Sequence, residues 1–352
     1  MSAFLHAIGT AVPRNDVHHI FIDWARQRLS GAREAALFDR MAARAGIAHR
    51  WSVLPEAYDP TGPDGLYGTD LWPGTAARMD IYAQAAPALA LSAIGDLGDK
   101  VPLHGITHLV VASCTGFVAP GIDQIIASRL DLTPSIERVL IGFMGCYAAV
   151  AALRTARHIV RSEPAARVLV VTVELSTLHL QATDDLEALL AMLQFGDGAA
   201  AALISGEPGG IDLGQPFVTT LPDSADLIRW TVTDHGFAMH LSGEVPGRIA
   251  TALADPVFAL EATGGTSPAA VDGWAVHAGG RSILDAVERS LDLPQDALSA
   301  SRAVLSENGN MSSCTLMFVL ARLLDGPTIE QGVALAFGPG LAAEGFRFAS
   351  AA

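Results

Sequence analysis

Short apolar runs alternate with stretches of helical periodicity along the first half of the chain. The runs at 4–13, 108–113, 139–143, 168–173 and 199–204 predict strands. Apolar residues at helical spacing predict helices over 17–29, 33–45, 75–97, 122–130 and 148–160, with another after the acidic pair at 184–185. A stretch rich in Pro, Gly and Asp at 55–73 predicts a long loop. This alternation indicates an α/β fold in which helices cover a sheet.

The second half of the chain repeats this order. Strands are expected over 274–277, 303–305, 332–337 and 343–348, and helices over 282–291 and 314–324. The strand and glycine turn at 139–145 matches the one expected at 303–309, and Phe-Gly-Asp-Gly from 195 matches Phe-Gly-Pro-Gly from 337. We therefore predict a duplicated α/β unit with a first domain over 1–210 and a second over 211–352.

Composition narrows the class of protein. Half of the 352 residues are hydrophobic and the formal net charge is −15, which argues against nucleic acid or an anionic membrane surface as a partner. No apolar run approaches the length of a membrane span, and the N-terminus lacks the features of a signal peptide. Cysteines at 114, 146 and 314 form neither a disulfide framework nor a zinc spacing. We expect a cytoplasmic protein without a metal or a membrane span.

Cys146 follows the turn Gly-Phe-Met-Gly at the end of the predicted strand 139–143 and precedes the predicted helix 148–160. A helix N-terminus favours negative charge, so this position is expected to lower the thiol pKa and to favour a nucleophilic thiolate. In a duplicated fold, equivalent turns meet at the pseudo-twofold axis. Cys146 and Asn310 are therefore expected to converge, and His277, at the end of its own strand, is expected to join them.

A cysteine, a histidine and an asparagine at such turns suit one kind of chemistry. His277 can accept the thiol proton of Cys146, which then attacks a thioester. His277 and Asn310 can then donate hydrogen bonds to one oxygen, where negative charge develops when a malonyl group loses carbon dioxide. A papain-like protease uses the same residue types, but its local signature is absent around Cys146.

The motifs around these three residues resemble those of type III polyketide synthases of the chalcone synthase superfamily. The motifs are Gly-Phe-Met-Gly-Cys146-Tyr-Ala-Ala, His277-Ala-Gly-Gly, Gly-Asn310-Met-Ser-Ser and Phe337-Gly-Pro-Gly, and the resemblance extends over nearly the whole chain. It implies the thiolase fold, a duplicated layered α-β-α-β-α architecture, and a homodimer. It also implies an acyltransferase without cofactor or metal, which condenses an acyl-CoA starter with malonyl-CoA through a Cys thioester by repeated decarboxylative Claisen steps. Cyclisation would give a pyrone, resorcinol or phloroglucinol product from a fatty acyl or small acyl starter.

The resemblance also assigns residues, with Cys146 as the nucleophile and His277 and Asn310 as its partners. Arg40 and Arg44 match basic positions that hold CoA phosphates. Phe195 matches a gatekeeper phenylalanine, and Met239 takes the other gatekeeper position, where plant members usually carry Phe. The remaining matches are positions that line the cavity: Cys114, Ser176, His179 and Ser312.

Simpler interpretations remain open for several of these residues. Arg40 and Arg44 share a helix face that could be only solvated, Cys114 could be a small core residue, and His179 could be only packed. Cys314 lies inside a predicted helix and is expected in the core. Two alternative functions also remain, a β-ketoacyl-acyl carrier protein synthase III-like enzyme and a catalytically silent thiolase-fold binding protein. The Gly-Asn-Met-Ser-Ser and Phe-Gly-Pro-Gly motifs favour the polyketide branch.

Overall fold

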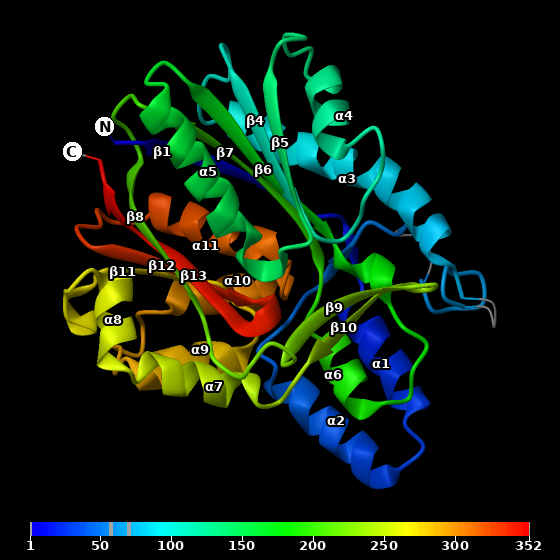
Figure 1. The fold of residues 1–352 in the computed structure, drawn as a ribbon. Helices are drawn as coiled ribbons and strands as arrows, with labels where there is room; N and C mark the ends of the chain where they lie inside the picture. Colours follow the sequence, from blue (N-terminus) through cyan, green and yellow to red (C-terminus); the bar gives the residue numbers. More distant parts are fainter. Residues whose placement is uncertain (1, 56–58, 69–71, 352) are drawn as a thin grey trace.

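A 9-stranded sheet runs through the computed structural model, which describes residues 2–55, 59–68 and 72–351 (Figure 1). Residues 56–58 and 69–71 of the predicted loop at 55–73 therefore lie outside the described residues. In spatial order the strands are β11 (Gly273–Val276), β12 (Gly332–Gly338), β13 (Ala342–Ser350), β8 (Ile211–Thr220), β1 (Phe4–Ala11), β7 (Asp197–Ser205), β6 (Arg167–Leu175), β4 (His108–Ser113) and β5 (Glu137–Gly142).

The sheet has the same pairing pattern on either side of its centre. From β1 outward, β7 pairs antiparallel, β6 antiparallel to β7, and β4 parallel to β6. From β8 outward, β13 pairs antiparallel, β12 antiparallel to β13, and β11 parallel to β12. The two halves meet where Phe4 and Leu5 of β1 pair with Asp212 and Ile211 of β8. This repetition agrees with the duplicated unit, and β5 extends the first half by one further strand.

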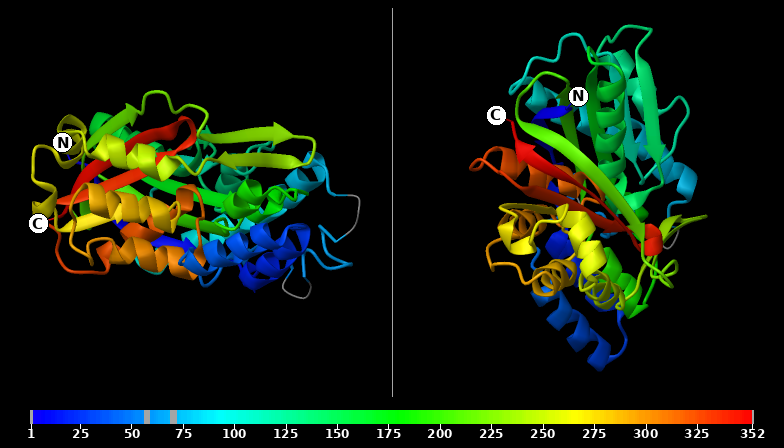
Figure 2. Two further views of the ribbon diagram at one scale, coloured as in Figure 1. Left: turned by 90° about the horizontal axis from the view of Figure 1, so that it is seen from below. Right: turned by 60° about the vertical axis from the view of Figure 1, so that its left-hand side comes forward.

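Two helices, α5 (Ala148–Ser162) and α11 (Ser313–Leu324), pack against each other between the two halves of the sheet (Figures 1 and 2). Their apolar faces share one core cluster with Val110 of β4 and with Ala336 of β12. Because successive strand residues point to opposite faces, the residues next to Val110 and Ala336 in the sequence face the outer layers of helices.

The outer faces of the sheet are covered by further helices. On the first half, Leu109 and Val111 of β4 pack with α3 (Thr75–Gly98) and α4 (Ile122–Arg129). On the second half, Leu335 of β12 packs with α7 (Val245–Leu253) and α9 (Arg281–Ser290). The order helix, sheet, helix, sheet, helix is the predicted layered architecture.

The other elements lie around this frame. Helices α1, α2 and α6 form a separate cluster with its own small core, and β9 pairs with β10 in a hairpin beside them (Figure 1). The bounds are α1 (His18–Arg28), α2 (Ala32–Arg44), α6 (Leu186–Met192), α8 (Pro256–Thr263), α10 (Ser299–Asn308), β2 (Asn15–Asp16), β3 (Trp51–Ser52), β9 (Ile228–Thr233) and β10 (Gly236–Leu241). Short 3-10 turns cover Gly145–Tyr147, Ser176–His179, Pro268–Ala270 and Pro339–Leu341.

One predicted element is wrong. The strand expected over 303–305 lies inside α10, because Ser301, Val304, Leu305 and Asn308 are buried at the spacing of one helix face. The glycine turn that follows is therefore the end of a helix, whereas the turn before Cys146 follows a strand. None of the helices in the described ranges is both long enough and apolar enough to cross a membrane.

Candidate active site

Cys146 lies where the chain passes from a strand to a helix, as predicted. Strand β5 ends at Gly142, a 3-10 turn covers Gly145–Tyr147, and α5 begins directly afterwards. The turn requires a positive φ at Phe143 (59°) and at Gly145 (78°). The second value suits glycine, which adopts such angles without steric cost.

The Phe-Gly-Pro-Gly segment of the second half packs closely against this turn. A Cβ at Gly145 would lie 2.4 Å from Cδ of Pro339, and one at Gly338 would lie 2.7 Å from Cδ1 of Tyr147. Only glycines allow the two backbones to come this close. The two segments together leave Cys146 only 7% exposed.

His277 and Asn310 come together through one turn. His277 follows β11, its backbone N–H donates to the carbonyl of Leu335, and its carbonyl accepts from the N–H of Gly279. The side-chain amide of Asn310 then donates to the carbonyl of Gly279 over 3.2 Å. The side-chain oxygen of Asn310 accepts from the backbone N–H of Ser312 over 2.8 Å, which fixes the orientation of the amide. Asn310 is thus held against the turn that carries His277.

The turn Gly145–Tyr147 contacts α11, which begins directly after Ser312, and the side chains of Ser312 and Asn310 act to lower the pKa of the Cys146 thiol. The structure therefore brings the cysteine of the first half next to the asparagine turn of the second half. Both ring nitrogens of His277 are buried without a hydrogen-bond partner. The imidazole thus has a free donor or acceptor position on either side.

The expected lowering of the thiol pKa is wrong for this structure. Burial raises the pKa of Cys146 to about 12, although the hydrogen bonds from Ser312 and Asn310 act in the opposite direction. Burial also lowers the pKa of His277 to about 3. Burial therefore favours the neutral form of both groups in this structure.

Cys114 is bound to the backbone beside the candidate nucleophile. Its Sγ accepts from the N–H of Gly145 over 2.8 Å, and burial raises its pKa well above the ordinary value. The contact fixes the turn directly before Cys146. Cys314 lies in α11 and donates to the carbonyl of Gly198, which confirms its predicted place in the core.

Glu174 is a buried carboxyl group that the sequence analysis does not single out. Its oxygens accept from the backbone N–H of Cys114 and from the hydroxyl of Thr115, each over 2.9 Å, and from the hydroxyl of Ser313. Burial raises its pKa to about 7, against these hydrogen bonds. Its sequence signal is a single carboxylate directly after the apolar run at 168–173.

We expect Glu174 to make the free energy of unfolding fall as the pH rises. The carboxyl has a pKa of 4.5 in its ordinary state and of about 7 in the folded protein. Its contribution to the free energy of unfolding is therefore complete below pH 4.5 and is lost as the pH rises through about 7. The loss is about 3 kcal/mol between about pH 5 and about pH 8. Glu174→Gln should flatten this dependence in denaturant titrations, and the exposed Glu261→Gln is the matched control. Equal pH slopes in wild type and Glu174→Gln would contradict the assignment.

A second group of predicted residues lines one apolar cavity. Ser176, His179, Phe195 and Met239 all contribute to it, together with Phe21, Leu54, Met192, Trp230 and Phe237. We call this space the apolar cavity. The three residues Cys146, His277 and Asn310 are not part of its wall.

Phe195 connects the apolar cavity to Asn310. The N–H of Gly196 donates to the carbonyl of Asn310 over 3.0 Å, and the N–H of Asn310 donates to the carbonyl of Gln194 over 2.8 Å. The backbone of Phe195 therefore runs beside the asparagine turn while its side chain lines the cavity.

His179 uses both ring nitrogens within the protein. Nε2 donates to the carbonyl of Thr115 over 2.7 Å, and Nδ1 accepts from the N–H of Phe237 over 3.1 Å. Burial lowers its pKa to about 3, so the ring is neutral. The imidazole shapes the cavity wall and its nitrogens hold the wall in place.

A surface cleft opens on the side of α2, α6 and α9. Arg44 lines this cleft, as does Arg281, whose guanidinium donates to the carbonyl of Arg44 over 3.3 Å. Arg281 is a candidate that the sequence analysis missed, although it directly follows the His-Ala-Gly-Gly motif. Arg40 lies on α2 but does not line the cleft. In the described ranges no cluster of His, Cys, Asp and Glu could hold a metal ion.

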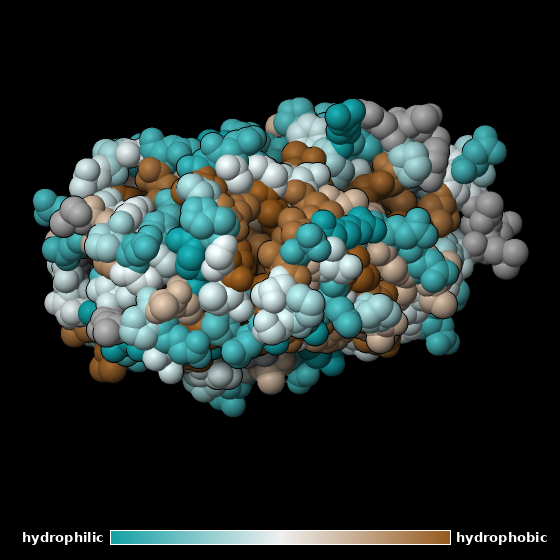
Figure 3. All heavy atoms as spheres, turned by 90° about the horizontal axis from the view of Figure 1, so that it is seen from above, coloured by the Kyte–Doolittle hydropathy of each residue, from teal (hydrophilic) through white to brown (hydrophobic). Residues whose placement is uncertain are grey.

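The edge strand β5 carries an apolar surface. Phe117, Val139, Leu140 and Phe143 are exposed there, between 40% and 56%. We call these residues the β5 face. Figure 3 views the molecule from the side on which β4 and β5 lie and shows hydrophobic residues gathered in a hollow band between polar ones.

Comparisons with known proteins agree over the whole chain. The family model for the N-terminal domain of chalcone and stilbene synthases matches residues 1–208, and the model for the C-terminal domain matches residues 213–352. Among curated proteins, the chain is 36% identical over 286 residues to "alpha-pyrone synthesis polyketide synthase-like Pks18" of Mycobacterium tuberculosis and Mycobacterium bovis. The match covers 77% of this chain and 72% of the relative.

Solved structures show the same fold. The C-terminal type III polyketide synthase domain of Steely1 from Dictyostelium superposes with a TM-score of 0.89 at 26% identity, covering 100% of both chains. PKS-I from the brown alga Ectocarpus siliculosus superposes with a TM-score of 0.87 at 27% identity, covering 99% of this chain and 98% of its own.

Proposed function

Because the chain belongs to the chalcone and stilbene synthase family and is a type III polyketide synthase, we propose that Cys146, His277 and Asn310 perform its condensation reaction. The observation that carries this proposal is the convergence of the three turns. The amide of Asn310 is bound to the turn of His277, and the turn of Cys146 contacts α11, which begins three residues after Asn310. Both ring nitrogens of His277 are buried and make no hydrogen bond in the protein.

Loading begins with Cys146. Its sulfur attacks the carbonyl carbon of an acyl-CoA while a ring nitrogen of His277 accepts the thiol proton. The C–S bond to CoA breaks, the proton passes to the leaving CoA thiolate, and the acyl group remains on Cys146. The neutral imidazole is the form that can accept this proton.

Extension uses the other two residues as donors. Malonyl-CoA loses carbon dioxide, and the electron pair of the broken bond passes into an enolate whose oxygen accepts hydrogen bonds from His277 and Asn310. The enolate carbon then attacks the thioester on Cys146. The Cys146 thiolate leaves, and a β-ketoacyl-CoA is formed that can be loaded again.

The surface cleft suits the CoA part of these substrates. Arg44 and Arg281 place two cations at its wall, which also carries Asp185, Glu187 and Asp285; Asp285 pairs with Arg281 over 3.6 Å. Guanidinium groups bind phosphates through charge-assisted hydrogen bonds, and a CoA phosphate would compete with Asp285 for Arg281. Arg40, one turn earlier on α2, would act at the outer margin of the cleft.

Replacing the two cleft arginines should weaken CoA ester binding. We expect the double variant Arg44→Ala with Arg281→Ala to raise KM by about tenfold at low ionic strength and by less at high salt, because salt screens exposed charges. The turnover number should change little. Arg33→Ala, an exposed arginine on α2 outside the cleft, is the control. An unchanged KM in the double variant would return these residues to a solvated surface role.

The apolar cavity suits the acyl chain. Its wall is mostly aliphatic and aromatic, so burial of an alkyl chain is favourable there. This supports an acyl starter, fatty or small, and a pyrone, resorcinol or phloroglucinol as product. Met239 at the wall adds a flexible side chain that can adapt to chains of different shape.

The β5 face supports a homodimer. An exposed edge strand with apolar side chains is a place where a second copy can bind. Leu140 on this face is 47% exposed. Leu140→Asp should shift the protein from dimer to monomer in sedimentation, since a charge would be buried at the contact. Val257→Asp on α8, at a residue 73% exposed, should leave the dimer intact, and loss of the dimer in both variants would argue against the β5 face.

The test of the proposed function is product formation from radiolabelled malonyl-CoA with a panel of acyl-CoA starters. We expect labelled polyketide from CoA esters alone. Condensation only with malonyl-acyl carrier protein would instead support the synthase III-like alternative. Absence of turnover with any donor would support the catalytically silent one.

A further inference from the structure

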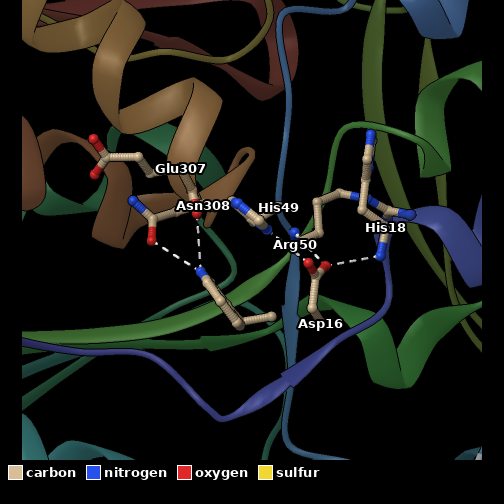
Figure 4. A network of polar contacts seen from close by, with 7 residues as sticks. Asp16, His18, His49, Arg50, Glu307 and Asn308 are labelled. Carbon is tan, nitrogen blue, oxygen red and sulfur yellow. Dashed lines mark hydrogen bonds and ion pairs between the residues drawn. The ribbon is translucent and has the colours of Figure 1, made fainter.

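Arg50 places a cation in the wall of the apolar cavity. Its guanidinium is held in one position: Nη1 donates to the carbonyls of Met192 (3.1 Å) and Phe195 (2.8 Å), and Nε donates to Nδ1 of His18 (3.0 Å). Figure 4 shows Arg50 beside His18 and Asp16, in the network that joins the start of α1 to the strand β3. The side chain as a whole is 2% exposed.

The third nitrogen of this guanidinium makes no hydrogen bond, although the guanidinium carbon lies 4.6 Å from the centre of the Phe21 ring. Nη2 is buried and makes no hydrogen bond, and among the described residues that line the apolar cavity the hydroxyl of Ser176 is also buried without a partner. Buried polar groups in proteins are nearly always hydrogen-bonded, so each exception needs an explanation. Two groups without a hydrogen bond in the wall of one mostly apolar cavity point to a ligand with acceptor atoms.

The neighbouring carboxylates Asp16 and Asp197 do not accept a hydrogen bond from Nη2 of Arg50. Asp16 accepts from Nδ1 of His49 (2.7 Å) and from the backbone N–H groups of His18 and Arg50. Asp197 accepts from the N–H of Val53 and from Thr177. Burial lowers the pKa of Arg50 to about 9, which leaves the group positively charged near pH 7. An acceptor oxygen on a ligand would therefore gain a charge-assisted hydrogen bond.

We propose that Arg50 Nη2, together with the hydroxyl of Ser176, recognises an oxygen on the acyl chain inside the apolar cavity. The inference rests on the proposed function, because it takes the cavity to hold the acyl chain. The ligand class is an acyl group that carries a ketone or carboxylate oxygen beyond its thioester. Such an oxygen has two sources: it belongs to the starter, or it is a β-keto oxygen added during extension.

The first arm of the test uses the wild-type enzyme and starter loading alone. Acyl-CoA pairs of matched length, one saturated and one with a distal keto or carboxylate group, are compared by CoA release without malonyl-CoA. If the starter supplies the oxygen, the oxygenated member should load about tenfold faster at one or more lengths. Arg50→Lys and Ser176→Ala should remove this preference, and the serine variant keeps the arginine network intact.

The second arm uses a saturated starter with malonyl-CoA. If the growing chain supplies the oxygen, Arg50→Lys and Ser176→Ala should release products with fewer extensions, and this change should exceed any change in their rate of starter loading. The control is Arg78→Lys. Arg78 is equally buried, is held by the carbonyls of Leu178 and Leu180, and also has an unpartnered Nη2, but it does not line the apolar cavity.

The outcomes are separable. The inference would be overturned if both members of every pair loaded equally and both variants gave unchanged product lengths. Arg50 would then have only a structural role, through its hydrogen bonds to the segment at 192–195. The same changes in Arg78→Lys as in Arg50→Lys would also overturn it. Failure of the wild type to load any acyl group would instead contradict the proposed function itself, on which the inference depends.

Discussion

A Cys146→Ala variant should fold normally and form no polyketide, with a loss of at least about a thousandfold in product formation. Cys146 is the thiol at the junction of β5 and α5, in a turn that contacts α11. The other nearby thiol, Cys114, cannot replace it, because its sulfur is bound to the N–H of Gly145 and burial raises its pKa further.

Decarboxylation should partly survive in the same variant. His277 and Asn310 remain in place, so malonyl-CoA can still lose carbon dioxide and release acetyl-CoA. Extracted products and released carbon dioxide should be measured in parallel. Cys314→Ala, which removes a buried thiol in α11, is the control and should keep product formation. Condensation by Cys146→Ala at a rate near that of wild type would contradict the assignment of the nucleophile.

The second large effect is expected for Asn310→Ala. Decarboxylation and condensation should fall by about a hundredfold to a thousandfold, because a donor to the enolate oxygen is lost. Starter loading should fall much less, since the thiol of Cys146 and the imidazole of His277 are both retained. The measurement compares carbon dioxide release from malonyl-CoA with acyl transfer from a starter CoA.

Asn308→Ala is the matched control for this prediction. Asn308 ends α10, accepts from Nε1 of Trp51 and donates to the carbonyl of Val304, so its loss disturbs the same segment without removing a donor from the site. Equal losses of loading and decarboxylation in Asn310→Ala would contradict a specific role at the enolate. A similar pattern in Asn308→Ala would indicate that only the fold of the segment matters.

The layered fold was predictable where periodicity is unambiguous. The run at 108–113 has four successive apolar residues, Leu109 to Ala112, and is buried at every position because both sheet faces are covered, and it forms β4 as expected. Three apolar residues at 303–305 were insufficient, because a short apolar run does not separate a strand from one face of a helix. The stretch 221–272 yielded no predicted element, although it contains the β9–β10 hairpin, α7 and α8.

The candidate site was predictable in its residues but not in its electrostatics. Glycine turns beside Cys146, His277 and Asn310 indicate their convergence in a duplicated fold. The raised thiol pKa of Cys146 depends on burial by Gly338 and Pro339, which are far away in the sequence. No local pattern distinguishes Arg50 from Arg44, because the difference lies in the carbonyls of Met192 and Phe195, which the Arg50 guanidinium meets only after folding.

The measurement that tests the central claim most directly is the intact mass of the protein after incubation with acyl-CoA, followed by peptide mapping. The account predicts one acyl group per chain, located on the peptide that contains Cys146, and its disappearance with release of labelled product when malonyl-CoA is added. An acyl group on another residue, or product formation without any covalent adduct, would contradict it.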